Sequence, residues 1–389
     1  MSHDAVFTHA KVVLEDRVIE GSVSVVDGRI DAIDEGPASL PGAQDLGGDY
    51  LIPGLVDLHT DSLEIHLEPR RGVFWDGMAA AIAHDAVTIA AGVTTVFDAV
   101  CIGEVAGRPV HEVALDTMLA GLEQARDGDA LRADHHLHLR CEITDPKVMR
   151  YLDPRIEHDM VQLVSVMDHA PGHRQMKDVE HLRNTWMIGA RGLSPEQADR
   201  HIEELMRRSR EVAPDMRKQV TEVAHSRGLA VASHDDETIE HITMAADLDI
   251  DIAEFPTTAE AAHEAHRRGI AVLMGGPNLV RGGSHGGNVA AGDLANAGVL
   301  DALMSDYIMS SMLMGALTLT NDTFGFALPE AIAMVSSSPA RIAGLDDRGR
   351  IEVGLRADLV HIRIDGGRPS VRRVWREGPL ENVFIKPTC

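Results

Sequence analysis

The sequence predicts an α/β protein, a distorted (β/α)8 barrel joined to a small β-sandwich domain that is formed from both chain ends. Three observations support this prediction. Eight apolar segments of strand length alternate with helical segments through the middle of the chain. The segments before and after them have the alternating pattern of half-buried strands. The 389 residues also exceed the roughly 250 residues that such a barrel needs. We expect the small domain at residues 1–52 and 346–389, and the barrel at 53–345.

The two chain ends are expected to form one sheet domain because they share a β pattern. Residues 5–35 alternate apolar and polar side chains, and Asp27-Gly28 inside them is a hairpin turn signal. Residues 36–49 are rich in Gly, Pro and Asp and are expected to be a linker. Near the other end, short strands are expected at residues 349–351, 357–362 and 371–375.

The middle of the chain predicts a parallel barrel. Alternating strands and helices are typical of βαβ units, and eight of them favour closure of the sheet. Helices with one apolar face are expected at Asp215–Arg227 and Thr257–Arg268. The eight expected strands are 54–59, 93–98, 135–142, 161–168, 229–234, 251–255, 270–275 and 302–306.

Composition narrows the classes of function. The formal net charge of −25 disfavours non-specific nucleic-acid binding, which needs a basic face. No apolar run approaches the ~20 residues of a membrane span, and the N-terminus does not have the pattern of a signal peptide. Three cysteines cannot form a disulfide framework, so we expect a cytoplasmic protein. An anionic ligand would need a local cluster of Arg or His.

Residue types that bind metals gather where the predicted strands end, which is where barrel enzymes carry their active sites. Taken singly, each has an ordinary alternative, such as a hydrogen-bonded His or an Asp that caps a helix. Their coincidence at five strand ends predicts one centre for one or two divalent ions. Zn²⁺ suits His and carboxylate ligands best, with Mn²⁺ or Fe²⁺ as alternatives. The predicted ligands are His59, Asp61, Glu142, His169, His234 and Asp306.

A second group of residues predicts a polyanionic substrate. Glycines around Arg281, Ser284 and His285 would let backbone N–H groups approach phosphate oxygens, although such a loop can also be a flexible lid. Arg70 and Arg174 follow two other predicted strands and would add cationic groups. His138 and Arg140 share one face of their strand with Glu142, and we expect them to contact the metal ligands or the substrate.

Several long motifs resemble the amidohydrolase superfamily. They include GLVDLH, LHLRCE, VSVMDHAPGHRQ, ASHDDET, MGGPNLVRGGSHGGNVAA and the closing GLRADLV. Within the superfamily the chain is similar to a branch that hydrolyses the triphosphate of a phosphorylated sugar in phosphonate degradation by the carbon–phosphorus lyase pathway. Two departures from the superfamily pattern are Asp61, in place of a second His, and Glu142, in place of a carbamylated Lys.

The resemblance implies a metal-dependent diphosphatase that acts on a small phosphorylated sugar and binds neither nucleic acid nor membrane. Asp306 is expected to be the general base that accepts a proton from the attacking water. One alternative is hydrolysis of a C–N bond in a cyclic amide or N-acyl amine, which needs fewer cationic groups. Another is a non-catalytic scaffold, but such proteins typically lose metal ligands. The oligomeric state stays open, with a homo-oligomer as one alternative.

Overall fold

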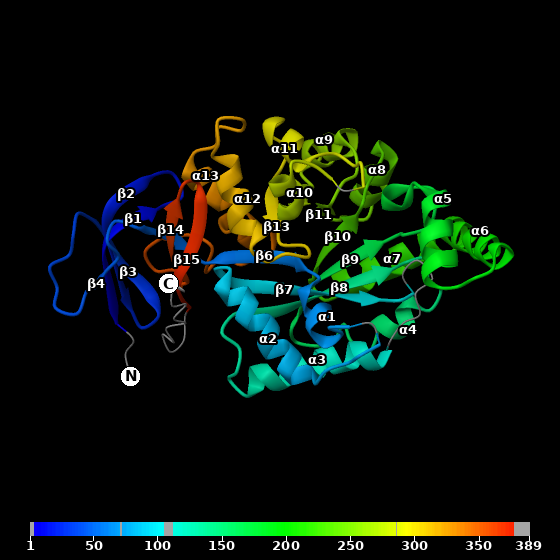
Figure 1. Cartoon of the computed structure of the whole chain (residues 1–389), viewed down its shortest axis with the longest axis horizontal. Coiled ribbons are helices and arrows are strands. Elements are labelled where there is room, and N and C mark those ends of the chain that lie inside the picture. Colours follow the sequence, from blue (N-terminus) through cyan, green and yellow to red (C-terminus); the bar gives the residue numbers. More distant parts are fainter. Residues whose placement is uncertain (1–3, 71, 105–111, 285, 377–389) are drawn as a thin grey trace.

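A computed structural model describes residues 4–376, except for residue 71, residues 105–111 and residue 285. Within this part of the chain there are two sheets, an eight-stranded parallel sheet and a seven-stranded mixed sheet. Figure 1 shows the mixed sheet at one end of the molecule, beside the larger sheet and its helices.

The eight-stranded sheet is the predicted barrel. Its strands lie in sequence order, so each pairs in parallel with the next one along the chain. Both faces of such a sheet are covered, which explains the nearly continuous apolar strand sequences. All eight predicted strands are confirmed as β6 (Leu55–Thr60), β7 (Val93–Ile102), β8 (Asp134–Glu142), β9 (Val161–Met167), β10 (Ala230–His234), β11 (Ile252–Glu254), β12 (Ala271–Gly275) and β13 (Ala302–Met304).

The first and last strands of this sheet meet at their carboxyl ends, which nearly closes the barrel. Thr60 and Asp306 form an isolated parallel bridge. The Asp306 N–H donates to the His59 carbonyl at 3.0 Å, and the Asp61 N–H donates to the Asp306 carbonyl at 2.9 Å. The Asp57 carboxylate adds a link, because it accepts from the Ser305 N–H at 3.0 Å.

Helices surround the barrel, and most of them bury their apolar faces on its outer side. Several begin at a capping residue whose side chain accepts a backbone N–H of the first turn. Asp76, Thr238 and Thr258 cap in this way. The surrounding helices are α1 (Ser62–Leu67), α2 (Gly77–Ala90), α3 (Glu112–Asp127), α4 (Val148–Leu152), α7 (Ala213–Ser226), α8 (Ile239–Ala246), α9 (Ala259–Arg267), α10 (Gly276–Arg281), α11 (Ala291–Asn296), α12 (Ser311–Leu319), α13 (Leu328–Ala333) and α14 (Ser337–Ile342). The two predicted helices correspond to α7 and α9.

Between β9 and α7 the chain makes a helical excursion with a small apolar cluster of its own. It contains the 3-10 turn η2 (Arg174–Met176), α5 (Val179–His181), the π-helical segment η3 (Leu182–Ala190) and α6 (Pro195–Glu211). The cluster is formed by Leu182, Met187, Ala198, Ile202 and Leu205. Figure 1 shows α5 and α6 at the end of the molecule opposite the mixed sheet.

The mixed sheet combines both chain ends, as predicted. Antiparallel pairing of β5 with β14 joins the N-terminal strands to the C-terminal hairpin. The rings of Phe7 and Trp375 pack with centroids 4.5 Å apart in its core. Its strands are β1 (Ala5–Val13), β2 (Val18–Val26), β3 (Arg29–Glu35), β4 (Gln44–Asp45), β5 (Tyr50–Pro53), β14 (Leu359–Asp365) and β15 (Arg368–Trp375).

Local details of this sheet both support and correct the sequence analysis. The hairpin turn at Asp27-Gly28 is confirmed, with φ of +48° and +75°, as a tight hairpin requires. The expected strand at residues 349–351 is wrong. Gly349 has a φ of +85°, and a Cβ there would lie 2.8 Å from the Ser336 carbonyl oxygen. The chain therefore turns at this point, and Ile351 is buried without being part of a strand.

A buried polar network ties α2 to the outer side of β7 and β8. The Asp98 carboxylate lies 2.6 Å from Nε2 of His84 and 2.7 Å from Nδ1 of His135. Burial alone lowers the pKa of His135, but the charge of Asp98 and the neighbouring Asp85 outweigh burial and raise this pKa to about 9. His135 is therefore expected to be a buried imidazolium at neutral pH.

The pKa of His135 predicts a pH dependence of stability. A histidine whose folded-state pKa exceeds its unfolded value of ~6.5 contributes stability that is fully present below pH ~6.5. This contribution is lost as the pH rises toward about 9. We expect the free energy of unfolding of the native protein, relative to His135→Gln, to fall by on the order of 3 kcal/mol between pH 6 and pH 9. Urea titrations at both pH values measure it, and parallel pH profiles would contradict it.

Candidate active site

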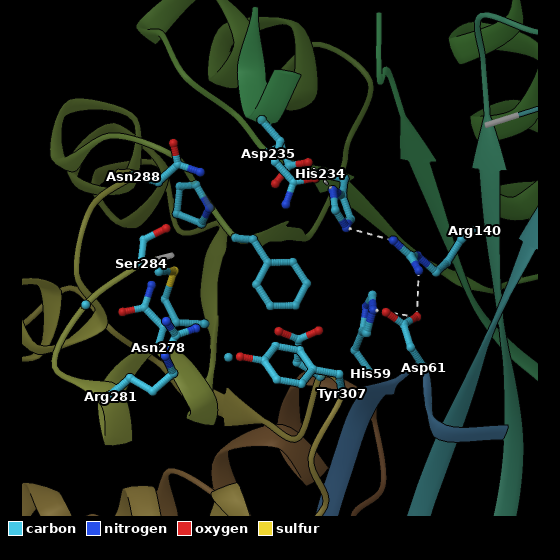
Figure 2. Close-up of a pocket in the computed structure, with 17 residues that line it drawn as sticks. His59, Asp61, Arg140, His234, Asp235, Asn278, Arg281, Ser284, Asn288 and Tyr307 are labelled. Carbon is cyan, nitrogen blue, oxygen red and sulfur yellow. Dashed lines mark hydrogen bonds and ion pairs between the residues drawn. The ribbon is translucent and has the colours of Figure 1, made fainter. Parts of the chain in front are cut away.

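A cavity opens at the carboxyl ends of the barrel strands. One wall carries histidines and carboxylates, and the facing wall carries amide, hydroxyl and guanidinium groups. Figure 2 shows His59, Asp61, Arg140 and His234 on one side, and Asn278, Arg281, Ser284 and Asn288 on the other. The lining residues are His59, Asp61, Arg140, Gln175, His234, Asp235, Phe255, Pro256, Met274, Gly275, Asn278, Arg281, Gly283, Ser284, Asn288, Asp306 and Tyr307.

His59 and Asp61 lie together at the end of β6, as their spacing predicts. Nε2 of His59 is 3.5 Å from Oδ1 of Asp61. The same oxygen accepts a hydrogen bond from Nη1 of Arg140 at 2.6 Å. Burial alone raises the pKa of Asp61, but the Arg140 guanidinium together with the imidazoles of His59 and His234 outweighs burial and holds this pKa well below its usual range. Asp61 is therefore an ionised carboxylate between a histidine and an arginine.

His234 and His169 lie beside this group, and each contacts a carboxylate. Nδ1 of His169 is 2.8 Å from Oε2 of Glu142. Nε2 of the same ring is 3.6 Å from Oδ2 of Asp235. Nδ1 of His234 is 2.9 Å from that Asp235 oxygen. Glu142 and His169 lie behind the cavity wall, whereas His234 and Asp235 line it.

Glu254 is a site residue that the sequence analysis missed. It ends β11, its carboxylate is fully buried, and its Oε1 lies 3.2 Å from Nδ1 of His59. Burial alone raises the pKa of Glu254, but the imidazoles of His138 and His59 outweigh burial and lower this pKa to about 2. The only signal in the sequence was a second carboxylate, after Asp251, in a predicted strand that is otherwise apolar.

Three left-handed residues explain how neighbouring residues reach the same cavity. Successive side chains of a strand point to opposite faces, so a residue adjacent to a cavity-facing histidine should point away. Asp235, Phe255 and Asp306 instead have φ of +56°, +52° and +56°. Each follows a strand and still donates its N–H to the next strand, at Glu254, Leu273 and His59 respectively. This bend turns Asp235 into the cavity beside His234, which period-two reasoning could not predict.

Asp306 lines the cavity at the seam between β13 and β6. Burial, together with the neighbouring Asp61, raises the pKa of Asp306 to about 6, although His59 opposes this shift. Gly275 makes room for it, because a Cβ at this position would lie 3.1 Å from Oδ2 of Asp306. Asp306 is therefore a carboxylate of raised basicity that faces the cavity.

The residues present fit a divalent metal ion. His59, His234 and Glu254 bring their ligand atoms within 4.8 Å of one another, and so do His169, His234 and Asp235. Oε2 of Glu254 is buried without a hydrogen-bond partner among the described residues. A buried carboxylate oxygen without a partner is costly, and a cation would offset that cost. Imidazole and carboxylate donors without thiolate suit Zn²⁺, Mn²⁺ or Fe²⁺.

Only some of the residues predicted to bind substrate line the cavity. Arg140, Arg281 and Ser284 line the cavity, and Arg281 is exposed. Arg70 does not line it, and His285 lies outside the described residues. Four further cavity residues were not predicted as site residues: Gln175, Asn278, Asn288 and Tyr307. The first three lie within motifs that carry the family resemblance, whereas Tyr307 only follows a predicted strand.

Two other predicted substrate residues are buried and bonded within the protein. Arg174 places Nη1 2.9 Å from Oδ1 of Asp236 and donates to the His234 carbonyl at 2.6 Å. His138 places Nε2 2.8 Å from the Ser165 hydroxyl, inside the barrel and beneath the cavity. Neither lines the cavity, so any effect of Arg174 or His138 on a ligand passes through the residues that they hold.

Comparisons with known proteins agree with this arrangement. Residues 183–378 match the model of the amidohydrolase family. The chain is 40% identical over 374 residues to α-D-ribose 1-methylphosphonate 5-triphosphate diphosphatase of Escherichia coli K12, covering 96% of this chain and 99% of the relative. It is also 34% identical over 151 residues to imidazolonepropionase of a Ruegeria species, covering 36% of each chain.

Solved structures share the fold at low identity. N-acetylglucosamine-6-phosphate deacetylase of Pasteurella multocida superposes with a TM-score of 0.60 at 14% identity, covering 97% of this chain and 100% of that chain. 5-methylcytosine deaminase of Klebsiella pneumoniae superposes with a TM-score of 0.63 at 14% identity, covering 99% of each chain. No helix among the described residues is both long and apolar enough to cross a membrane. The family model and the nearly full-length relative show that this chain belongs to the amidohydrolase family.

Proposed function

We propose that this protein is a metal-dependent diphosphatase that converts α-D-ribose 1-methylphosphonate 5-triphosphate to the 5-phosphate and pyrophosphate in phosphonate catabolism. The E. coli relative bears the name of this activity and is 40% identical over 96% of the chain. The structural observation that carries the proposal is a cavity whose buried histidine and carboxylate wall faces an arginine-bearing wall. In a chain of net charge −25, a local cationic wall favours an anionic ligand.

The metal centre is the first part of the proposal. One or two divalent ions would be held by residues from five strand ends, with Zn²⁺ favoured over Mn²⁺ or Fe²⁺. A bound ion of this kind lowers the pKa of a water molecule and polarises a phosphoryl oxygen. Support comes from the convergence of the His59, His169 and His234 rings on four carboxylates, which are those of Asp61, Glu142, Asp235 and Glu254. The proposed ligands are His59, Asp61, Glu142, His169, His234 and Asp306.

Asp306 is the proposed general base. Its carboxylate lines the cavity at the β6–β13 seam, where it can accept a proton from a water molecule on the metal-binding wall. The water oxygen then bonds to the phosphorus nearest the ribose. The bond from that phosphorus to the bridging oxygen breaks, and pyrophosphate leaves with the electron pair. The ribose keeps one phosphate.

The facing wall would bind the triphosphate. Arg281 offers a planar pair of donors to phosphate oxygens, and Ser284 adds a hydroxyl beside it. Arg140 would approach the phosphate nearest the metal-binding wall, although it also neutralises Asp61. His285 stays a prediction from the sequence, as does Arg70. Arg174 would act indirectly, because its guanidinium holds the His234 carbonyl and Asp236.

The reaction itself is the first test of this proposal. Protein loaded with Zn²⁺ or Mn²⁺ is incubated with ribose 1-methylphosphonate 5-triphosphate, and phosphorus NMR follows the products. We expect equal amounts of pyrophosphate and the 5-phosphate, because attack at the phosphorus nearest the ribose leaves one phosphate on the sugar. Chelated protein should release neither product. Turnover of a dihydropyrimidine or an N-acyl amine without pyrophosphate release would favour C–N hydrolysis instead.

Asp306→Asn tests the proposed base. An amide of the same shape cannot accept the proton of the water, so we expect kcat to fall by about 10²–10⁴-fold. The midpoint of thermal unfolding should stay close to that of the native protein. Asp322→Asn is the matched control, because Asp322 is exposed in the α12–α13 connection and away from the cavity lining. Near-native kcat for Asp306→Asn would exclude the role.

Arg281→Ala tests the cationic wall. A hydrogen bond from a charged group contributes about 1.5–3 kcal/mol, so we expect KM for the triphosphate to rise by roughly 10–100-fold. Arg267→Ala serves as the control, since Arg267 is an exposed arginine on α9 whose described partner is Glu264. Steady-state kinetics at two salt concentrations measure both variants. If both gave the native KM, Arg281 would have no part in binding.

A further inference from the structure

Glu254 is a buried titratable group of the site for which the proposed mechanism has no role. Its carboxylate is fully buried at the end of β11, behind His59 as seen from the cavity lining. Oε1 lies 3.2 Å from Nδ1 of His59, and Oε2 has no hydrogen-bond partner among the described residues. A buried carboxylate with an oxygen that lacks a hydrogen-bond partner destabilises the fold, so its presence here calls for an explanation.

The ring of His59 is held on several sides. Its edge-to-face contacts are with Phe255, at 5.1 Å between centroids, and with His138, at 5.2 Å. Nδ1 faces Glu254, whereas Nε2 lies 3.5 Å from Asp61, which lines the cavity. The two ring nitrogens therefore have different surroundings, and only Nε2 is turned toward the cavity wall.

The proton on His59 follows from the chemistry of its partner. An ionised carboxylate only accepts hydrogen bonds, so the 3.2 Å contact requires the proton on Nδ1. His138 competes weakly for Glu254, because its Nδ1 is 3.8 Å away and also faces the Leu58 carbonyl at 3.2 Å. Nε2 of a neutral His59 is then left with a free lone pair.

We propose that Glu254 is a positioning residue that accepts a hydrogen bond from Nδ1–H of His59 and so presents Nε2 of this ring to a divalent metal ion. Metal-binding histidines commonly donate their other ring N–H to a carboxylate, which fixes the tautomer and raises ligand basicity. The inference rests on the proposed role of His59 as a ligand. It assigns Oε1 of Glu254 to the ring, because this oxygen lies 3.2 Å from Nδ1 of His59, and leaves the metal ion to Nε2.

Phe255, the residue after Glu254, also helps to hold the His59 ring. Its φ of +52° is unusual for a bulky residue, and such strain persists where the surroundings require it. The bend brings the Phe255 ring against both His59 and His234, at 5.1 Å and 5.3 Å between centroids. Two consecutive residues therefore hold His59: Glu254 contacts its Nδ1, and the Phe255 ring packs edge-to-face against its imidazole ring.

Glu254→Gln tests the inference with the native side-chain shape. Three quantities are measured: zinc affinity by competition with a chromophoric chelator, the number of zinc ions bound at saturation, and the His59 tautomer by long-range nitrogen-15 NMR. We expect the affinity to fall by roughly 10–100-fold. The number of ions at saturation should stay native, and the NMR signal of the Nδ1–H tautomer should weaken.

The matched control is Asp98→Asn. Asp98 is also a fully buried carboxylate that pairs with Nδ1 of a histidine, but it lies on the outer side of the barrel sheet. This variant should lower the midpoint of thermal unfolding while keeping zinc affinity within about twofold of native. If Glu254→Gln fails to fold, Glu254→Asp is measured in its place. Its zinc affinity should lie between that of the native protein and the value expected for Glu254→Gln.

The outcomes separate this inference from the proposed function. Native zinc affinity and an unchanged His59 tautomer in Glu254→Gln would overturn the positioning role alone. Loss of one whole ion at saturation would overturn it too, because Glu254 would then be a ligand. A native protein that binds no divalent ion at all would overturn the proposed metal centre and this inference together.

Discussion

The candidate site depends on the contact between the first and last strands of the barrel. Asp57 is buried in β6, and its carboxylate accepts the N–H groups of Ser305 and His59. Burial raises the pKa of Asp57 to about 6, against these hydrogen bonds. Because Asp306 also donates its N–H to the His59 carbonyl, residues 247 positions apart become neighbours. Without this seam, Asp306 would not face the histidines of the opposite strand end.

The second constraint is the negative charge of the cavity, which nearby arginines neutralise in part. The cavity gathers several carboxylates in a chain of net charge −25, yet the proposed substrate is itself an anion. Arg140 neutralises Asp61 within the wall, and Arg174 neutralises Asp236 behind it. A divalent cation would offset the carboxylates that have no such partner. Arg281 is then left exposed on the facing wall, where its charge is available to a phosphate.

The sequence was sufficient to predict the barrel and to place the proposed site residues at strand ends. Both predictions depend on apolar segments of strand length and on their alternation with helices. The sequence was insufficient where tertiary contacts decide. Arg174 follows a predicted strand like a ligand-binding residue, but its pairing with Asp236 joins two loops that only the fold brings together. Asp235 was missed because a left-handed bend reverses its expected direction. Ile351 is apolar because it is buried at a turn, which a short pattern cannot distinguish from a strand.

The left-handed bends show why the site needs a rigid barrel beneath it. A residue in this conformation costs on the order of 1 kcal/mol or more, and Asp235, Phe255 and Asp306 all adopt it. Each retains its ladder hydrogen bond to the next strand, so the bend loses no backbone pairing. Adjacent residues can then face one cavity, and the density of functional groups at a strand end rises. The parallel ladder therefore does more than support the ligands. It also permits the left-handed bends that bring a second residue at the end of a strand into the cavity.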